Sequence, residues 1–427
     1  MQQLSNPKVK DLVLIGGGHS HVIVLKMFGI KPLPGVRLTL ISDVTHTPYS
    51  GMLPGHVAGF YDEDECHIDL RSLSQFAQAQ IFIDKAIALD LDKNQVICTN
   101  HPPINFNLLS IDIGSTPNTI SVPGAAAYTI PAKPVPEFLA NWNQLIKERQ
   151  NYQKPLCIAI VGGGAGGVEL ALNMQSRLLA ADAVNANNIS EQIDKLAVKS
   201  VTKSVVKFHL FHRDRELTIG HNQRVRRRLK EIMIGRGIEL HLGETVCAIQ
   251  KNNLNLPITN YQLPITNYQS PITNSQLPIT NYQIHCESGL KLECDRIFWV
   301  TQASAPNWIK ASGLSTDDKG FIQVNDYLQS ISHPHIFAAG DIATMINHPR
   351  PKAGVFAVRQ GKPLFENLQL FLLEKPLKAF VPQKQYLGLI GTGNKSAIAS
   401  RGPLMWESPL LWCWKDWIDR KFMEKFL

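Results

Sequence analysis

The sequence predicts an α/β protein made of two Rossmann-like domains and a short C-terminal extension. The prediction comes from a pattern that occurs twice. An apolar strand, a glycine-rich loop and a helix follow one another near the N-terminus, and the same order returns in the middle of the chain. The second loop begins at Gly162, which lies 146 residues (162 − 16) after Gly16 at the start of the first. A chain of 427 residues is long enough for two such domains.

The first unit starts with a mostly apolar run at residues 11–15, which is typical of a buried parallel strand. A helix over 20–28 and a second strand over 36–41 are expected to follow. Between the first strand and the helix, Gly16 and Gly18 fit the first two positions of the GxGxxG motif. One of these glycines makes a tight turn and the other lets a pyrophosphate approach the backbone, while the helix N-terminus offers N–H groups to the phosphates.

The first unit departs from the motif in two places. His21 stands where the third glycine normally allows close packing of helix on strand, so we expect the helix to splay or the imidazole to be turned aside. Ser42 occupies the usual place of the acidic residue that binds the ribose, and Asp43 follows one position later, which could point its side chain to the other face. His19 and His21 have no third ligand nearby in the sequence, so we expect no metal at this loop.

The second unit matches the motif completely. We predict a strand over 156–161, a helix over 166–179 and a strand over 205–211. The loop before the helix fills all three glycine positions, with Gly162, Gly164 and Gly167. Because this motif follows a strand and precedes a helix, it indicates a second dinucleotide site. Glycine-rich turns without a ligand are the alternative for both loops.

The end of the second strand in this unit bears on the choice of nucleotide. His212 occupies the position where a glutamate would select NADH, and Arg213 follows it. An arginine at this place pairs with the 2′-phosphate of NADPH. The sequence therefore slightly favours NADPH, and an exposed charged turn is the alternative.

Composition and charge exclude other classes of protein. The net charge is +8, but no known nucleic-acid motif accompanies the basic residues, so we expect no nucleic-acid partner. No apolar run is long enough for a membrane span, and the N-terminus lacks the apolar core of a signal peptide, so we expect a cytoplasmic protein. The seven cysteines are scattered without a CxxC pair, which indicates neither a zinc site nor a redox dithiol.

A heptapeptide repeat interrupts the second unit. The segment LPITNYQ recurs, with small changes, four times over residues 256–283. Each copy contains a proline, which excludes a coiled coil. We interpret the repeat as a low-complexity loop or β-ribbon inserted between two strands, because loops tolerate such additions at little cost.

Three further segments complete a set of motifs. Residues 109–117 look like the first copy of the crossover segment of two-dinucleotide flavoproteins, and residues 295–301 look like the second copy. Residues 335–341 look like the segment whose aspartate binds the FAD ribitol. With the two glycine loops, these segments cover most of residues 11–375. The chain thus resembles the pyridine nucleotide-disulfide oxidoreductase superfamily, on the side of the type II NADH dehydrogenases.

A narrower resemblance is carried by residues 47–55, 299–304 and 351–361. These segments are similar to the flavoprotein module that is fused ahead of selenide, water dikinase in some bacteria. The kinase itself is not in this sequence, so selenophosphate synthesis is not expected.

The resemblance implies a division into domains and a set of cofactor-binding residues. The FAD-binding domain would comprise 1–125 and 305–375, the NAD(P)-binding domain 126–304, and an interface or cap region 376–427. The FAD-binding residues would be Gly16, Gly18, His19, Ser42, Asp43, Pro48, Gly114 and Asp341. The NAD(P)H-binding residues would be Gly162, Gly164, Gly167, His212, Arg213 and Thr301.

The activity that the resemblance implies is hydride transfer from NAD(P)H to FAD, and onward to a quinone or another diffusible acceptor. No cysteine pair follows the first loop, so disulfide-reductase chemistry is not expected. One position argues against quinone as the acceptor, because the chain keeps Gln360 but has Val355 where type II dehydrogenases have another glutamine near the quinone. A reductase that serves selenium or sulfur metabolism, and a redox sensor with little turnover, are the alternatives.

Three residues are candidates for a catalytic role. Glu169 is expected in the first turn of its helix, either beside the nicotinamide or as an acid that complements the helix dipole. Tyr49 and Lys352 are expected beside the isoalloxazine, where a cation would favour the anionic reduced flavin. For Tyr49, a packed loop aromatic is the alternative.

The C-terminal residues 406–427 combine four tryptophans and two phenylalanines with basic residues. Such a composition suits contact with the inner face of a membrane. A helix that caps the flavin domain, or a contact in a homodimer, is the alternative.

Overall fold

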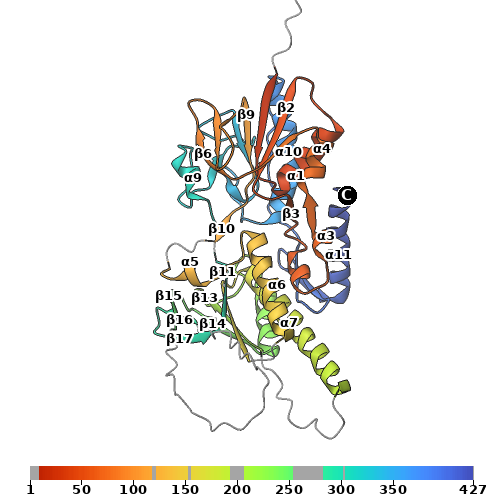
Figure 1. Ribbon diagram of the computed structural model, residues 1–427, viewed down its shortest axis with the longest axis vertical. Coiled ribbons are helices and arrows are strands. Elements are labelled where there is room, and N and C mark those ends of the chain that lie inside the picture. Colours follow the sequence, from red (N-terminus) through yellow and green to blue (C-terminus); the bar gives the residue numbers. More distant parts are fainter. Residues whose placement is uncertain are drawn as a thin grey trace, which may run out of the picture.

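The computed structural model describes residues 9–117, 122–151, 155–192, 206–252, 282–301 and 303–426. Most of the heptapeptide repeat lies outside these residues, so its interpretation as a loop or β-ribbon stays a prediction. Figure 1 shows two α/β lobes, one above the other, with the C-terminal helix α11 beside the junction between them. The protein therefore has the predicted fold class, with a parallel sheet in each lobe.

The first lobe is built on a five-stranded sheet in the order β21-β9-β1-β2-β5, and all of its neighbouring strands are parallel. The strands are β1 (Lys10–Ile15), β2 (Val36–Ser42), β5 (Gln80–Ile83), β9 (Leu108–Ile111) and β21 (Ile336–Ala338). Strand β21 comes from late in the chain. Two distant segments of the sequence therefore build one sheet.

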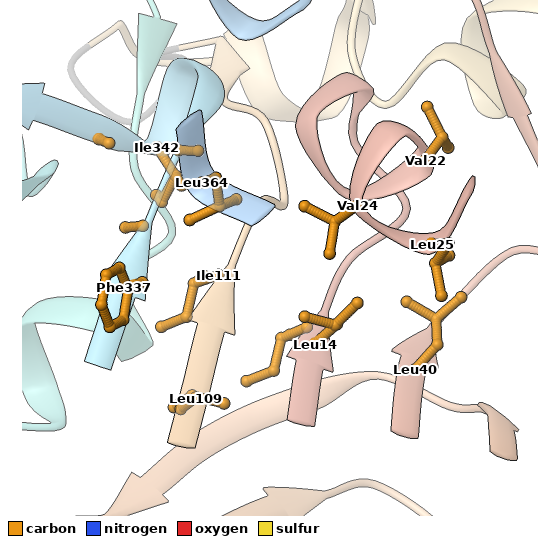
Figure 2. Close-up of a cluster of buried hydrophobic side chains, with 14 of the residues drawn as sticks. Leu14, Val22, Val24, Leu25, Leu40, Leu109, Ile111, Phe337, Ile342 and Leu364 are labelled. Carbon is orange, nitrogen blue, oxygen red and sulfur yellow. The ribbon is translucent and has the colours of Figure 1, made fainter. Parts of the chain in front are cut away.

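Helices α1 (His19–Ile30) and α10 (Gly354–Leu372) pack against each other beside this sheet. Figure 2 shows Leu14, Leu40 and Ile111 of the strands with Leu25 of α1 and Leu364 of α10 in one cluster of buried side chains. All five are fully buried, and the transfer of each from water contributes about 2 kcal/mol to folding. This core fixes the start of α1 at the carboxyl end of β1.

Smaller elements complete the first lobe. They are β3 (His46–Pro48), α2 (Leu53–Val57), α3 (Glu63–Cys66), β4 (His67–Asp69), α4 (Leu70–Phe76), β6 (Ala86–Asp90), β7 (Gln95–Cys98), β8 (Ile104–Asn105), α9 (Asn307–Ala311), β20 (Ile322–Val324), the 3₁₀ helix η2 (Gly340–Ile342) and β22 (Ala343–Met345). Strands β6, β7 and β8 form an antiparallel sheet of their own.

The second lobe repeats the architecture with a five-stranded parallel sheet in the order β11-β18-β12-β13-β14. Its strands are β11 (Ile130–Pro131), β12 (Leu156–Val161), β13 (Val206–His212), β14 (Ile238–Leu242) and β18 (Arg296–Trp299), and its helices are α5 (Ala125–Tyr128), α6 (Val135–Asn151), α7 (Ala165–Gln192) and α8 (Gln223–Gly235). An antiparallel sheet of β15 (Val246–Lys251), β16 (Tyr282–Cys286) and β17 (Lys291–Cys294) packs near it.

Helix α7 is longer than the sequence predicts, because it continues past 179 to Gln192. Residues 180–186 include four alanines, which have the highest helix propensity.

The two lobes are joined by the crossover segments, which pair as the antiparallel strands β10 (Thr116–Pro117) and β19 (Ala303–Ser304). The chain then ends in a three-stranded antiparallel sheet and a helix, namely β23 (Gly388–Gly391), β24 (Ala397–Arg401), β25 (Leu404–Ser408) and α11 (Pro409–Met423). Helix α11 contacts α3 of the first lobe and the sheet β23–β25, which in turn contacts α7 of the second. The C-terminal region thus bridges both lobes.

Candidate functional site: two glycine loops and the C-terminal helix

The first glycine loop lies between β1 and α1, and two of its glycines are required by close packing. Gly16 has a φ of +91°, and an added Cβ would overlap the carbonyl oxygen of Asp112. At Gly18 an added Cβ would overlap the carboxyl group of the same aspartate. Both glycines are therefore needed because Asp112 lies against the loop.

The Asp112 carboxylate caps the N-terminus of α1. Its Oδ2 accepts hydrogen bonds from the backbone N–H groups of Ser20 at 2.8 Å and His21 at 3.2 Å. These are the groups that the motif normally offers to an anionic ligand. Burial raises the pKa of Asp112 to about 7, although both hydrogen bonds oppose the rise. Near neutral pH this carboxyl group therefore changes charge beside the predicted pyrophosphate position.

His21 replaces the third glycine by turning its imidazole aside, which is one of the two expected outcomes. The ring is fully buried, with Nδ1 2.7 Å from the carbonyl oxygen of Gly16 and Nε2 2.8 Å from the hydroxyl of Ser110. Burial lowers the pKa of His21 to about 4, so the ring is neutral at pH 7. Because a carbonyl only accepts, Nδ1 donates to Gly16 and Nε2 accepts from Ser110.

Asp341 and Lys133 form an ion pair between the two lobes. The Lys133 ammonium, from the segment between β11 and α6, donates to Asp341 Oδ2 at 2.8 Å, and the Ser115 hydroxyl also reaches Asp341, at 3.1 Å. Burial opposes ionisation of Asp341, but the charge and hydrogen bond of Lys133, the Ser115 hydroxyl and the Lys352 charge together outweigh it, so the pKa of the carboxyl is lowered. The sequence did not point to Lys133.

The remaining residues predicted for the first site lie around the carboxyl ends of β1, β2 and β9. Ser42 is buried and donates to the carbonyl of Val44 at 2.9 Å, whereas Asp43 is exposed. Pro48 is half-buried in β3. Gly114 has a φ of +70° and no heavy atom within 4 Å of an added Cβ, so open space adjoins it.

These residues fit a flavin dinucleotide in type and place. They gather at the carboxyl edge of a parallel sheet, where open α/β sheets bind their ligands. Gly114 leaves room beside the loop, and Asp341 is an ionised acceptor inside it. The Asp112 carboxyl opposes an anionic ligand when it is ionised, and its raised pKa allows the neutral form near pH 7.

The second glycine loop opens onto a cavity of about 520 Å³. The cavity is lined by five of the six residues predicted for the second site, Gly162, Gly164, His212, Arg213 and Thr301. The sixth, Gly167, lies behind the loop, where an added Cβ would overlap the carbonyl oxygen of Gly162. Gly164 has no heavy atom within 4 Å of an added Cβ. This loop therefore combines close packing at one glycine with open space at another.

His212 and Arg213 have different roles at the rim of this cavity. His212 Nδ1 accepts a hydrogen bond from the N–H of Gly163 at 3.1 Å, so its ring holds the loop. Burial lowers the pKa of His212, which keeps the ring neutral. The Arg213 guanidinium is exposed, 3.9 Å from the Asp214 carboxylate.

The three candidate catalytic residues do not meet at one point. Glu169 lies in the second turn of α7, not the first, because the helix begins at Ala165. Its Oε1 accepts from the N–H of Gly391 in β23 at 2.7 Å. Burial raises the pKa of Glu169 to about 7, opposed by Lys415 of α11. Glu169 thus connects α7 to the C-terminal region, and its place beside the nicotinamide stays a prediction.

Tyr49 packs against α11. Its ring stacks on Phe422 with centroids 4.4 Å apart, and the ring of His19 lies 5.4 Å away. Burial and the nearby Asp419 raise the pKa of the Tyr49 hydroxyl. His19 Nε2 accepts from the N–H of Ser50 at 3.2 Å, and burial lowers the pKa of His19 to about 4. The described contacts of Tyr49 agree with a packed aromatic, and no contact tests its role at the flavin.

Lys352 is directed at β22. Its ammonium donates to the carbonyl of Ala343 at 2.6 Å and to the hydroxyl of Thr344 at 3.0 Å, and it lies 4.0 Å from the centroid of the Phe321 ring. Burial lowers the pKa of Lys352 to about 8. Lys352 and Asp341 line the same small cavity of about 20 Å³, so the amine remains close to the first site.

The C-terminal helix adds a charged cluster that the sequence did not reveal. The Lys415 ammonium is buried, pairs with Asp419 at 2.6 Å and donates to the carbonyl of Gly51. It lies close enough to Glu169 to oppose the rise of its pKa. Lysine and aspartate four residues apart are common on exposed helix faces, so the sequence gave no signal that this pair is buried.

Comparisons with known proteins agree with this geometry. Residues 10–361 match the family described as pyridine nucleotide-disulphide oxidoreductase. Ferroptosis suppressor protein 1 of Xenopus tropicalis is 25% identical over 87% of this chain and 83% of its own. The NADH dehydrogenase-like protein YutJ of Bacillus subtilis is 21% identical over 95% and 99%.

Solved structures share the fold. The structure of NDH2 from Plasmodium falciparum, in complex with NADH, has a TM-score of 0.71 at 13% identity and covers 98% of this chain and 97% of that one. The sulfide:quinone oxidoreductase of Aquifex aeolicus has a TM-score of 0.70 at 16% identity, over 98% and 91%. The chain therefore belongs to the pyridine nucleotide-disulphide oxidoreductase family, and it is an FAD-dependent NAD(P)H oxidoreductase of the type II NADH dehydrogenase-like kind.

Proposed function

We propose that this protein is an NAD(P)H dehydrogenase that passes electrons from its flavin to a quinone, at the surface of a membrane. When bound, NAD(P)H and FAD supply the redox chemistry, which is hydride transfer between their rings. The protein's own part is to hold the two cofactors, exclude water, and give the acceptor a place beside the flavin. The observation that carries the proposal is that α11 packs one face against the protein and exposes large apolar side chains on the other.

The inner face of α11 carries charged and aromatic groups toward both lobes. Lys415 and Asp419 form their buried pair against the backbone of Gly51 in the first lobe, and Phe422 stacks on Tyr49. Reduction of a quinone consumes protons as well as electrons. The Glu169 carboxyl, whose pKa of about 7 suits proton exchange near neutral pH, lies beside this pair.

The outer face of α11 and the neighbouring strand β25 expose large apolar side chains. They are Leu404, Trp406, Leu410, Trp414, Trp417 and Ile418, with Trp406 and Leu410 exposed by 74% and 78%. Lys421 and Lys425 lie on the same helix and the residues after it, each within cation–π distance of an aromatic ring. Tryptophan, leucine and lysine together suit the headgroup region of a bilayer. No helix among the described residues is long and apolar enough to cross a membrane.

The cofactor-binding roles form part of the proposal. Gly16, Gly18, Gly114 and Asp341 would hold FAD, with Lys133 as a cation that the sequence did not predict. The cavity behind Gly162 and Gly164 would hold the nucleotide. The position of this cavity at the glycine loop of the second lobe supports this assignment.

The test combines an acceptor screen with a lipid-binding assay. The purified holoprotein is reduced anaerobically with NADH or NADPH and then mixed with a short-chain ubiquinone, a naphthoquinone, selenite or polysulfide. We expect rapid reoxidation by quinone and co-sedimentation with anionic vesicles. Trp414→Ser and Trp417→Ser together should abolish sedimentation without changing reduction by NAD(P)H. Reoxidation by selenium or sulfur compounds alone would contradict quinone as the acceptor. A stable dimer that buries α11 would contradict binding of this helix to a membrane.

A further inference from the structure

Two histidines and one glutamate meet on the sheet of the second lobe. We propose that His209, Glu239 and His241 bind one divalent transition-metal ion of the Zn²⁺ type. Among the described residues, these three form a group whose ligand atoms all lie within 4.8 Å of one another. The sequence predicts no metal site, for reasons that concern the first glycine loop and the cysteines, and no local pattern marks these three residues.

The register of two parallel strands brings the three side chains to one face. Glu239 and His241 stand two residues apart on β14, and alternate residues of a strand point to the same side. His209 of β13 is directly beside Glu239, while Phe211 is beside His241. Because β14 is the edge strand of the sheet, an ion can approach the group from the solvent.

Two of the three distances between the ligand atoms suit a metal with short bonds, and the third is at most 4.8 Å. His209 Nδ1 lies 3.1 Å from His241 Nε2 and 3.4 Å from Glu239 Oε2. Tetrahedral Zn²⁺ with bonds of about 2.0–2.1 Å separates its ligand atoms by roughly 3.3–3.4 Å. The Glu239 side chain is 61% exposed and free to adjust, whereas His209 is held in the sheet with 6% exposure. One ligand is therefore fixed and another is adaptable.

The types of side chain in the group also favour a metal. Two histidines and one carboxylate are a ligand set that zinc uses in proteins, with water at the fourth position. Without an ion, the two rings share one hydrogen bond and a ring contact with centroids 5.4 Å apart.

The ion would clamp the edge strand β14 to β13. It would also fix the ring of His241, which stacks on Phe211 with centroids 4.3 Å apart at an interplanar angle of 13°. Phe211 lines the cavity behind the second glycine loop. The proposed ion would thus have a structural role next to a residue that lines the nucleotide cavity. This proposal does not depend on which acceptor the protein uses.

The test is isothermal titration of the full chain, stripped with a chelator, with Zn²⁺ and separately with Mg²⁺. The exposed thiols of Cys247 and Cys413 are first blocked by alkylation, because thiolates in general are zinc ligands. We expect one equivalent of Zn²⁺, no Mg²⁺, and a melting temperature that rises on adding Zn²⁺, since a ligand of the folded state stabilises it. Co²⁺ in place of Zn²⁺ should give the visible absorption of a tetrahedral site.

Matched variants decide whether the ion is at this site. His241→Gln and Glu239→Gln should each weaken Zn²⁺ binding by at least about tenfold and remove the rise in melting temperature. His333→Gln, at a half-buried histidine whose ring lies 6.1 Å from that of His335, should change neither. Absence of a one-equivalent site, or binding that persists in both His241→Gln and Glu239→Gln, would overturn the proposal. Retained FAD content and circular dichroism show that the variants are folded.

Discussion

The two glycine loops both join a strand to the N-terminus of a helix, but different residues hold the two loops in place. In the second loop Gly167 allows the helix to pack on the loop, and Gly164 faces an open cavity. In the first loop His21 takes the place of the third glycine and ties the loop together with two hydrogen bonds, while Asp112 caps the helix. The comparison shows that the motif specifies the turn, whereas residues from elsewhere decide how the helix N-terminus is used.

The largest effect is expected from Gly167→Ala in the second loop. The new Cβ would overlap the backbone carbonyl of Gly162, which cannot move without shifting β12 or α7. We expect the free energy of unfolding to fall by about 3 kcal/mol and NAD(P)H binding to be lost. Urea unfolding and a nucleotide titration measure both. The control is Gly164→Ala, where no heavy atom lies within 4 Å and stability should hardly change.

A smaller effect is expected when the first loop is given the consensus glycine. His21→Gly leaves the Gly16 carbonyl and the Ser110 hydroxyl without their buried partner, so we expect a loss of about 2 kcal/mol in urea unfolding. His21→Asn, whose amide can donate in place of Nδ1, should cost less. If the glycine variant were as stable as the native protein, the first loop would not need His21, and glycine would serve at the third position of both loops.

The pH dependence of His21 follows from its lowered pKa. The unfolded ring has a pKa of about 6.5, while the folded ring has a pKa of about 4. The unfolded state therefore binds more protons between these values, and stability is lost as the pH falls from about 6.5 to 4, by up to about 1.4 kcal/mol per pH unit. The variant His21→Gly lacks this titration. The difference between its urea midpoint and that of the native protein should therefore be smaller at pH 5 than at pH 7.

The sequence predicted the framework of the fold and part of the site, for a physical reason. Parallel strands buried on both faces are continuous apolar runs, and a glycine loop is local, so β1, β12 and both loops are readable from short segments. Asp112 caps α1 at Ser20, which lies 92 residues earlier in the sequence. Lys133 pairs with Asp341, which lies 208 residues later. No local pattern marks a partner that only the fold brings near.

The next prediction asks whether Asp112 makes the first loop sensitive to pH. Below about pH 7 the carboxyl is protonated and does not repel a pyrophosphate, and above it the charge returns. We expect the dissociation constant of FAD to rise up to about tenfold per unit above pH 7. Asp112→Asn, of nearly equal shape, should remove this dependence. Fluorescence titration of the apoprotein at pH 6 and pH 8 decides the matter, and an unchanged pH profile in the variant would exclude Asp112 as its cause.

The smallest effect is expected at the rim of the second cavity, where Arg213 is exposed. A contact between an exposed guanidinium and the 2′-phosphate is worth about 1 kcal/mol, which corresponds to roughly a fivefold change in affinity. Arg213→Ala should therefore raise KM for NADPH about fivefold and leave KM for NADH nearly unchanged. Arg215→Ala is the matched control, because Arg215 is also exposed but is not among the residues that line the cavity. Equal losses for both nucleotides would show that Arg213 contacts the shared pyrophosphate instead, and the second loop would then bind its ligand without choosing between NADH and NADPH.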